Sequence, residues 1–193
     1  HYDLSSLRVT ASTGEPWTPE AWDWFKRHIC RGQAPLLNYS GGTEIGGGIL
    51  AGTRLHPDLK PCAFAGPIPG MGVAVLDESG APTPVGRSGE LCLTVPSIGL
   101  TRGLWNNPQG YLDSYWSKIP GVWAHGDLVS VDEDGQWFVH GRSDDTIKIA
   151  GKRTGPAEIE ALLLATGLVA EAAAVAIPEP VKGSAVVCVC VPA

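Results

Sequence analysis

Apolar and polar positions in the first third of the chain predict two short strands separated by a helix. Residues 7–11 alternate weakly as a strand does, and the polar loop at residues 12–16 ends this strand. Residues 35–39 form a second short apolar run, which leads into a glycine-dense turn at residues 40–48. The order strand, helix, strand is typical of the edge of an α/β domain.

The helix between these strands has a clear start in the sequence. Thr18 offers a hydroxyl that caps a first turn, Pro19 suits the first helical position, and Glu20 lies near the positive end of the helix dipole. We expect the helix to end by Gly32. One of its faces carries three apolar side chains: Trp22, Phe25 and Ile29.

The middle of the chain, between about residues 67 and 141, changes to short apolar runs separated by turn signals. Residues 77–80 and 132–135 are two such signals. Four runs have the length and composition of strands: residues 72–76, 90–95, 128–131 and 137–139. This spacing predicts antiparallel β structure, as a small barrel-like or sandwich-like subdomain.

After Gly141 the pattern is mixed again. Residues 146–149 predict one arm of a hairpin that turns at residues 150–152, and residues 156–166 predict a helix. Two further strands are expected: residues 172–177 and 185–191.

The expected fold class is therefore mixed, with both α/β and β-rich parts. Residues 1–66 would form the edge of an α/β subdomain, and residues 67–141 a small antiparallel, barrel-like subdomain. Residues 142–193 would begin an α+β domain, with the boundary near residues 142–145.

Composition and charge narrow the possible functions. The 193 residues carry 14 basic and 20 acidic side chains, a formal charge of −6. An extended nucleic-acid surface is therefore not expected, although a mononucleotide needs only a local basic group. The most apolar stretch, residues 161–177, contains Glu171 and is followed by Pro178, so we expect no membrane span.

The cysteines and the chain ends bear on the protein's setting. The 5 cysteines form no C-x-x-C pair, which favours small buried side chains in a reducing compartment, and we expect a cytoplasmic protein. The chain starts at His1 without an initiator methionine or a leader and stops after a strand-like run. We interpret it as a piece of a longer protein. The sequence does not predict an oligomeric state.

Candidate chemistry first appears in the glycine-dense turn. Glycines let the backbone approach a ligand closely, and Thr43 and Glu44 supply hard oxygen groups that suit Mg²⁺ or a phosphate environment. The turn matches neither the Walker nor the Rossmann glycine pattern. Taken alone, a flexible glycine turn explains it more simply.

Two charged residues elsewhere add to this picture. Asp127 follows Gly126 at the start of a strand, where its carboxylate can accept two hydrogen bonds from a diol such as a ribose. Arg142 follows Gly141 and can add a donor from the side. Each is explained separately by a turn aspartate or a surface salt bridge. The two indicate a nucleotide site only when they are joined to the glycine turn.

In their order along the chain, these segments resemble the adenylate-forming superfamily, in particular its acetyl-CoA synthetase-like branch. Members condense a carboxylate with ATP to an acyl-adenylate, release pyrophosphate and transfer the acyl group to coenzyme A. The resemblance implies part of an ATP-dependent acyl-CoA synthetase that uses ATP/AMP, Mg²⁺, coenzyme A and a carboxylic acid. Five segments carry it: residues 12–24, 40–44, 125–128, 141–145 and 149–160.

The resemblance assigns roles in the first half of the chain. Thr43 would contact the α-phosphate and Glu44 would help to position Mg²⁺, which makes them the predicted catalytic pair. The chemistry requires such groups because an anionic carboxylate attacks an anionic phosphate. One edge of the adenine would lie against a loop of three residues: Gly14, Glu15 and Pro16. The other edge would lie against the strand end and turn: Asn38, Tyr39, Ser40, Gly41 and Gly42.

The resemblance also assigns roles in the second half. Asp127 would bind the ribose hydroxyls, Arg142 would support the ribose, and Arg153 would approach the phosphates. Asp144 matches the hinge of a mobile C-terminal domain that serves two half-reactions, although a helix or hairpin cap is the plain alternative. The pantetheine channel would be bordered by two residues: Ala150 and Gly151.

The glycine turn departs from the superfamily pattern at two positions. The superfamily usually has an aromatic residue stacked on adenine where Ser40 stands, so either Tyr39 replaces it or the stacking is lost. Acetate-specific members have a tryptophan where Gly41 stands. The loss of an indole leaves space, so we expect an acyl group larger than acetate, of the acetoacetyl or medium-chain kind.

Two other parts of the superfamily pattern lie outside the chain. Its phosphate loop would precede His1 and its catalytic lysine would follow Ala193, so the chain alone is expected to be inactive, with weak nucleotide affinity at most. Two alternatives stay open: an adenylation module that loads a carrier-protein thiol, and a noncatalytic β-rich binding module with tryptophan anchors. Trp22 and Trp24 lie two apart on the expected helix, so at least one should be exposed.

Overall fold

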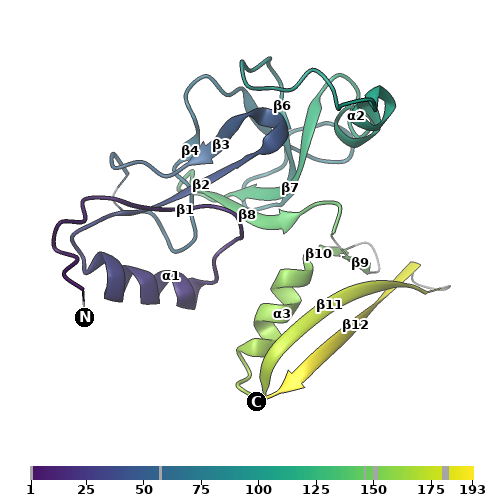
Figure 1. Ribbon diagram of the computed structural model, residues 1–193. Helices are drawn as coiled ribbons and strands as arrows, with labels where there is room; N and C mark the ends of the chain where they lie inside the picture. Colours follow the sequence, from purple (N-terminus) through teal and green to yellow (C-terminus); the bar gives the residue numbers. More distant parts are fainter. Residues whose placement is uncertain (1, 57, 146, 150–151, 180–182) are drawn as a thin grey trace. The chain divides into compact units, whose positions relative to one another are not determined.

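The computed structural model describes residues 2–56, 58–145, 147–149, 152–179 and 183–193. The chain divides into two compact units, His1–Val139 and His140–Ala193. Figure 1 shows the elements of each unit. The finer division into three parts stays a prediction.

The first unit opens with the expected strand, helix and strand. β1 (Thr10–Ser12) lies parallel to β2 (Leu36–Gly42). Between them the chain forms α1 (Pro19–Phe25), which continues as one π-helical turn, Lys26–Cys30. Figure 1 shows α1 alongside the β1 and β2 strands. This part of the sequence prediction is confirmed.

The start of α1 follows the capping pattern in the sequence. The Thr18 hydroxyl oxygen accepts a hydrogen bond from the backbone N–H of Ala21 at 3.3 Å, and this satisfies a donor that has no partner within the helix. Trp22 is 1% exposed, whereas Trp24 is 56% exposed. The two indoles therefore face opposite ways, as their spacing predicts.

The glycine-dense segment forms a hairpin rather than a loose turn. β2 extends through Gly42, a 3-10 turn named η2 (Thr43–Ile45) follows, and β3 (Gly47–Ala51) returns antiparallel to β2. The short β4 (Gly66–Pro67) completes a sheet of order β1-β2-β3-β4. The sequence does not predict this hairpin, because runs of glycine carry no strand pattern.

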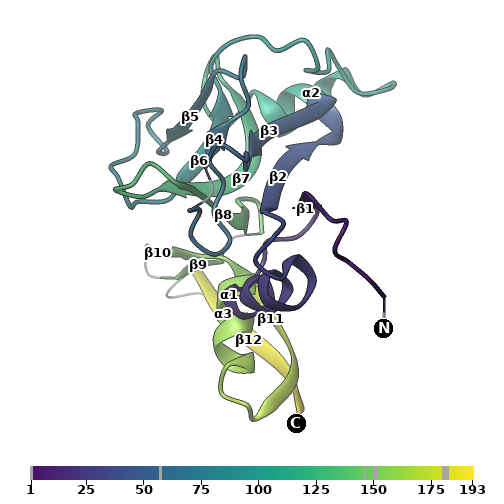
Figure 2. The same cartoon turned by 90° about the vertical axis from the view of Figure 1, so that its left-hand side faces the viewer.

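The rest of the first unit is the expected antiparallel sheet. Its order is β5 (Val73–Leu76), β6 (Gly89–Leu93), β7 (Trp123–Val131) and β8 (Trp137–Arg142). Figure 2 shows these strands side by side. The sheet is open, so the described strands do not close into the expected barrel. α2 (Pro108–Tyr115) was not predicted.

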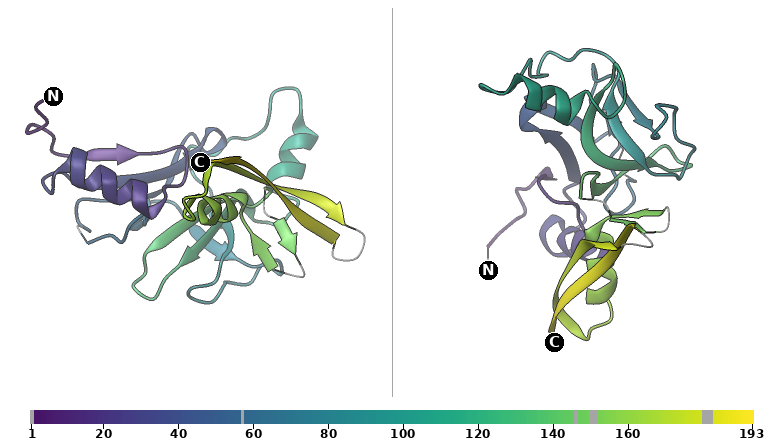
Figure 3. Two further views of the ribbon diagram at one scale, coloured as in Figure 1. Left: turned by 90° about the horizontal axis from the view of Figure 1, so that it is seen from below. Right: turned by 90° about the vertical axis from the view of Figure 1, so that its right-hand side faces the viewer.

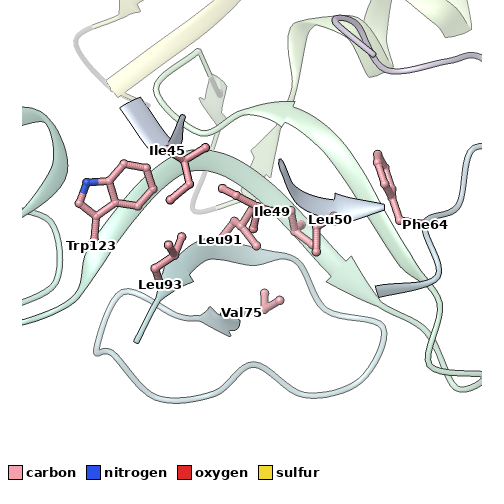
Figure 4. Close-up of a cluster of buried hydrophobic side chains, with 9 residues drawn as sticks. Ile45, Ile49, Leu50, Phe64, Val75, Leu91, Leu93 and Trp123 are labelled. Atoms are coloured by element: carbon pink, nitrogen blue, oxygen red, sulfur yellow. The ribbon is translucent and has the colours of Figure 1, made fainter. Parts of the chain in front are cut away.

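One core holds the glycine hairpin against this sheet. Ile45 of η2 and Ile49 of β3 are fully buried and pack with Leu91 of β6. Figure 4 shows these side chains pointing toward one another between the strands. The burial of such large apolar side chains contributes ~1.5–3 kcal/mol each. The whole cluster comprises Ile45, Ile49, Leu50, Phe64, Val75, Leu91, Leu93, Trp123 and Val129.

The second unit contains the expected strands and helix. β9 (Ile147–Ile149) pairs with β10 (Lys152–Thr154), and α3 (Pro156–Leu164) follows. The long antiparallel strands β11 (Val169–Glu179) and β12 (Gly183–Pro192) end the chain. Figure 3 shows α3 lying along the β11–β12 hairpin, which confirms the α+β character expected after Gly141.

Two other expectations concern membrane-spanning segments and the burial of the cysteines. Among the described residues, no helix combines the length and apolarity needed to cross a membrane. All five cysteines are free thiols. Burial was expected for most of them, but only Cys30 and Cys92 are buried, while Cys188 and Cys190 on β12 are exposed.

Asp132, in the turn between β7 and β8, makes the stability of the first unit depend on pH. Lys60 lies 2.6 Å from its carboxylate, and this hydrogen bond is the main reason that the pKa of Asp132 lies below its ordinary value of 3.8. A depressed folded pKa stabilises the fold above the unfolded pKa, and this contribution is lost as the pH falls through the folded value. We expect the melting temperature of the chain to decrease as the pH is lowered below 3.8. In Asp132→Asn this decrease should be less steep. Equal slopes would refute this origin of the pH dependence.

Candidate functional site

The parallel pair β1–β2 brings two of the predicted adenine-binding segments to one sheet edge. Ser12, the last residue of β1, lies beside Asn38 of β2. Because the carboxyl ends of parallel strands meet at the same edge, the exposed loop after β1 emerges next to Asn38. This loop carries Gly14, Glu15 and Pro16.

Asn38 is held in place by its own side chain. The residue is 5% exposed, and its Nδ2 donates to the carbonyl oxygen of Cys62 at 2.8 Å and, more weakly, to that of Ala63 at 3.4 Å. Buried amides are stable when they are hydrogen-bonded in this way. The side-chain NH₂ of Asn38 therefore fixes the edge of the site, where the backbone of β2 is presented.

The structure bears on the missing adenine-stacking residue. Adjacent residues of a strand point to opposite faces, so Tyr39 does not take the direction of Ser40. The Tyr39 ring instead lies over Gly48, where an added Cβ would be 2.4 Å from Cε2 of the tyrosine. This arrangement favours the loss of stacking over its replacement by Tyr39.

Gly41 and Gly42 are required by close contacts. A Cβ on Gly41 would lie 2.1 Å from the carbonyl oxygen of Gly47, and a Cβ on Gly42 would lie 2.9 Å from Cε1 of His125. Along the Cβ direction of Gly41 there is therefore backbone rather than free space. The larger acyl group expected from Gly41 remains a prediction from the sequence.

Thr43 and Glu44 lie on η2, whose main chain is hydrogen-bonded to Thr101. Thr43 is exposed and Glu44 is half-buried. The carbonyl oxygen of Glu44 accepts from the N–H of Thr101 at 2.7 Å, and the Thr101 carbonyl accepts from the Tyr111 hydroxyl at 2.7 Å. Gly46 ends the turn with a φ of 61°, which a residue without a Cβ adopts readily. The two predicted catalytic side chains thus stand on a fixed backbone.

The predicted ribose motif lies on β7. Asp127 is 8% exposed and His125 is 6% exposed. His125 Nε2 lies 3.5 Å from Asp127 Oδ2, and the His125 ring is the one that faces Gly42. One imidazole therefore connects the glycine hairpin to the aspartate, two segments that are far apart in sequence.

Sequence reasoning missed Glu90, which is 5% exposed on β6. One of its carboxylate oxygens accepts from the N–H of Gly126 at 2.8 Å, and the other accepts from Lys118 Nζ at 2.5 Å. The signal that could have found it is a charge inside a strand whose residues are all buried. Buried charges require partners.

The other predicted site residues belong to the second unit. Arg142 and Asp144 form a two-pronged ion pair, with Nε–Oδ1 at 2.9 Å and Nη2–Oδ2 at 3.2 Å. For Arg142 this is the surface salt bridge given above as the plain alternative to a ribose role, whereas for Asp144 the plain alternative was a helix or hairpin cap. Arg153 lies on β10, and Ala150 and Gly151 lie outside the described residues, so their predicted roles stay predictions.

The chain is similar in sequence to known enzymes. Residues 1–105 match the family model for the AMP-binding enzyme. Acetyl-coenzyme A synthetase of Methanothrix thermoacetophila is 37% identical over 190 residues, which cover 96% of this chain and 29% of that protein. The Pyrobaculum aerophilum protein of the same name is 40% identical over 185 residues, covering 94% of this chain and 28% of that protein.

A solved structure is similar as well. It is the anthranilate CoA ligase AuaEII in complex with anthranoyl-AMP, with a TM-score of 0.77 and 26% identity over 99% of this chain and 35% of that one. The chain thus spans less than a third of the two acetyl-coenzyme A synthetases above. More than half of it matches the family model, and the chain belongs to the AMP-binding enzyme family.

Proposed function

We propose that the chain is part of an ATP-dependent acyl-CoA synthetase that forms an acyl-adenylate and then an acyl-CoA. The observation that carries the proposal is the contact of Gly42 with His125, whose Nε2 lies 3.5 Å from Asp127. Through it, a hairpin with phosphate chemistry and a strand with ribose chemistry form one site within the first unit. A nucleotide is a ligand that uses both chemistries.

Each group of the first unit has a definite task in this proposal. Asp127 accepts hydrogen bonds from the ribose hydroxyls, and the loop after β1 and the β2 backbone lie on either side of the adenine. Thr43 donates its hydroxyl to the α-phosphate. A nucleotide fixed by its sugar and base presents the α-phosphorus in a constant orientation, and positioning of this kind lowers the barrier to attack by the carboxylate.

Glu44 fits a magnesium ion that is shared with phosphate. Mg²⁺ is usually bound through one or two carboxylates together with substrate phosphates, rather than by an all-protein cage. Among the described residues, no group of three or more histidine, cysteine or acidic side chains is arranged to hold a metal. A single half-buried carboxylate on a fixed turn suits the shared mode, in which the ion screens the phosphate charge.

The second unit has a proposed role in the thioester-forming half-reaction. Asp144 is the proposed hinge, Arg142 and Arg153 are proposed to approach the ribose and the phosphates, and Ala150 and Gly151 are proposed to border the pantetheine arm. Support comes from the motif order and from the antiparallel pairing of β9 with β10. The exposed Arg142–Asp144 pair contributes little to stability, so breaking it requires little free energy.

The substrate and the location are part of the proposal. Relatives named acetyl-coenzyme A synthetase and a structural neighbour named anthranilate CoA ligase indicate a carboxylic acid and coenzyme A as substrates. The acyl group is proposed to exceed acetate in size on the resemblance alone, which puts the tryptophan of acetate-specific members where Gly41 stands, since the Cβ direction of Gly41 meets the Gly47 carbonyl oxygen and not free space. A cytoplasmic location is proposed because all five cysteines are free. No nucleic-acid partner is proposed for a chain of charge −6.

Two other functions compete with this proposal. An adenylation module that loads a carrier-protein thiol would use the same nucleotide site. A noncatalytic binding module would use exposed tryptophans as anchors, and Trp24 and Trp105 are 56% and 92% exposed. The sequence similarity to acetyl-coenzyme A synthetases favours the first proposal over both.

Product analysis separates these functions. The full-length protein that contains this chain is incubated with ATP, Mg²⁺ and a panel of carboxylic acids, with either coenzyme A or a carrier protein bearing a pantetheine arm. We expect AMP, pyrophosphate and acyl-CoA in equal amounts. Acyl transfer to the carrier alone would establish the carrier-loading module, and a folded protein that forms no product with either thiol would leave the binding module.

A further inference from the structure

The ribose motif lies on an irregular stretch of β7. Glu90 of β6 lies opposite Leu128, and Cys92 lies opposite Ala124. Between these pairs one residue of β6, Leu91, faces three residues of β7, namely 125–127. Bulges of this kind re-aim side chains and interrupt the ladder of backbone hydrogen bonds.

The bulge leaves a backbone donor that the ladder does not use. Gly126 has a φ of 89°, in the region that glycine adopts most easily. Its N–H would be costly to bury without an acceptor. Glu90 Oε1 lies 2.8 Å from this nitrogen and accepts its hydrogen bond.

Glu90 has the other properties of a fixed anchor. It is 5% exposed on a strand whose residues are all buried, and Lys118 lies 2.5 Å from its second oxygen. The charge of Glu90 also contributes, after burial itself, to raising the pKa of Cys92 to about 12. A buried carboxylate that accepts both a lysine and a backbone N–H has little freedom to move.

We propose that Glu90 is the positioning residue of the ribose site and that Lys118 is its counter-charge. Glu90 holds the N–H of Gly126, and this fixes the direction in which the next residue, Asp127, presents its carboxylate. The inference rests on the proposed role of Asp127 in binding the ribose hydroxyls. It adds a pair of residues that touch no substrate but set the geometry of one that does.

The test uses nucleotides that differ only in the ribose hydroxyls. Binding of AMP, 2′-deoxy-AMP and 3′-deoxy-AMP to the full-length protein is measured by calorimetry, for the wild type and for Glu90→Gln. The amide keeps the size and one acceptor oxygen but removes the charge. We expect AMP to bind about tenfold more weakly to the variant, a change of ~1.4 kcal/mol, and the deoxy nucleotides to lose less than about twofold.

Asp132→Asn is the matched control. Asp132 also accepts from a lysine, at 2.6 Å, and from a backbone N–H, that of Gln136, at 2.8 Å, but it lies in the turn beyond the end of β7. We expect this variant to lower the melting temperature and to keep the wild-type preference for AMP over the deoxy nucleotides. A lower melting temperature with an unchanged preference for AMP is the result expected of a variant that affects only the fold.

Lys118→Gln provides a second variant if Glu90→Gln does not fold. The Lys118 side chain is 36% exposed, so its replacement acts on Glu90 from the solvent side. We expect the preference for AMP over the deoxy nucleotides to fall about threefold, which is ~0.65 kcal/mol. This variant therefore tests the effect on the ribose site while the Glu90 carboxylate itself stays intact.

Several outcomes would overturn the assignment of Glu90. These are an equal loss of affinity for AMP and the deoxy nucleotides, an unchanged preference in folded variants, and a wild-type protein that does not bind AMP. Pyrophosphate exchange is measured in parallel. Ribose-dependent AMP binding without exchange would refute the proposed synthetase and keep the role of Glu90. Normal exchange with an unchanged preference would keep the synthetase and refute the role of Glu90.

Discussion

Replacing Asp127 with alanine is expected to weaken AMP binding by the full-length protein about 10²- to 10⁴-fold. Each of two hydrogen bonds from a ribose to a carboxylate contributes ~1.5–3 kcal/mol, and ~1.4 kcal/mol corresponds to a tenfold change in affinity. Calorimetric titration with AMP measures the loss directly. Pyrophosphate exchange should fall with it, because the sugar no longer fixes the nucleotide.

Asp127→Asn is the conservative partner of this variant. The amide keeps one acceptor oxygen at the same position, so we expect it to lose about tenfold, less than alanine. Circular dichroism shows whether both variants stay folded, which matters because Asp127 is 8% exposed. Unchanged AMP affinity in a folded Asp127→Ala protein would rule out the ribose role.

Gly41→Ala should produce the largest loss of stability among small changes at the site. Its Cβ would lie 2.1 Å from the Gly47 carbonyl oxygen, so the paired backbones of β2 and β3 must separate. Overpacking of this kind costs ~1–3 kcal/mol or more. We expect the free energy of unfolding, measured in urea, to fall by about 3 kcal/mol, and AMP binding to weaken because the same hairpin carries Thr43.

Gly47→Ala is the control on the facing strand. An added Cβ there meets nothing within 4 Å, and Gly47 is paired with Gly42 in the same hairpin. We expect a change within about 0.5 kcal/mol. Similar losses for the two variants would show that general glycine loss, rather than the approach of Gly41 to β3, sets the stability of the hairpin.

The elements that local signals could predict were the ones with caps or regular alternation. Thr18 and Pro19 predicted the start of α1, and the apolar runs between turns predicted the antiparallel strands. α2 has the same kind of start, since Asn107 caps the N–H of Gly110 ahead of Pro108. It was missed because a glycine within the first turn weakens helix propensity.

The chemistry of the site was more predictable than its assembly. Motif residues such as Thr43 and Asp127 are recognisable one by one from side-chain type. The contact between Gly42 and His125 joins positions more than 80 residues apart, and it exists only because Ile45 and Ile49 pack onto the sheet. Such long-range contacts leave no local pattern. For Glu90 the charge inside an apolar strand was the one local signal, and its partners Gly126 and Lys118 lie on other segments.

ATP–pyrophosphate exchange by the full-length protein tests the central claim most directly. The assay follows labelled pyrophosphate into ATP with Mg²⁺ and single carboxylates, from acetate through acetoacetate and benzoate to long chains. We expect exchange that depends on the carboxylate, is strongest with an acid larger than acetate, and is lost in Asp127→Ala. Exchange that is strongest with acetate would contradict the size of the acyl group, and no exchange with any acid by a folded protein would contradict the synthetase itself.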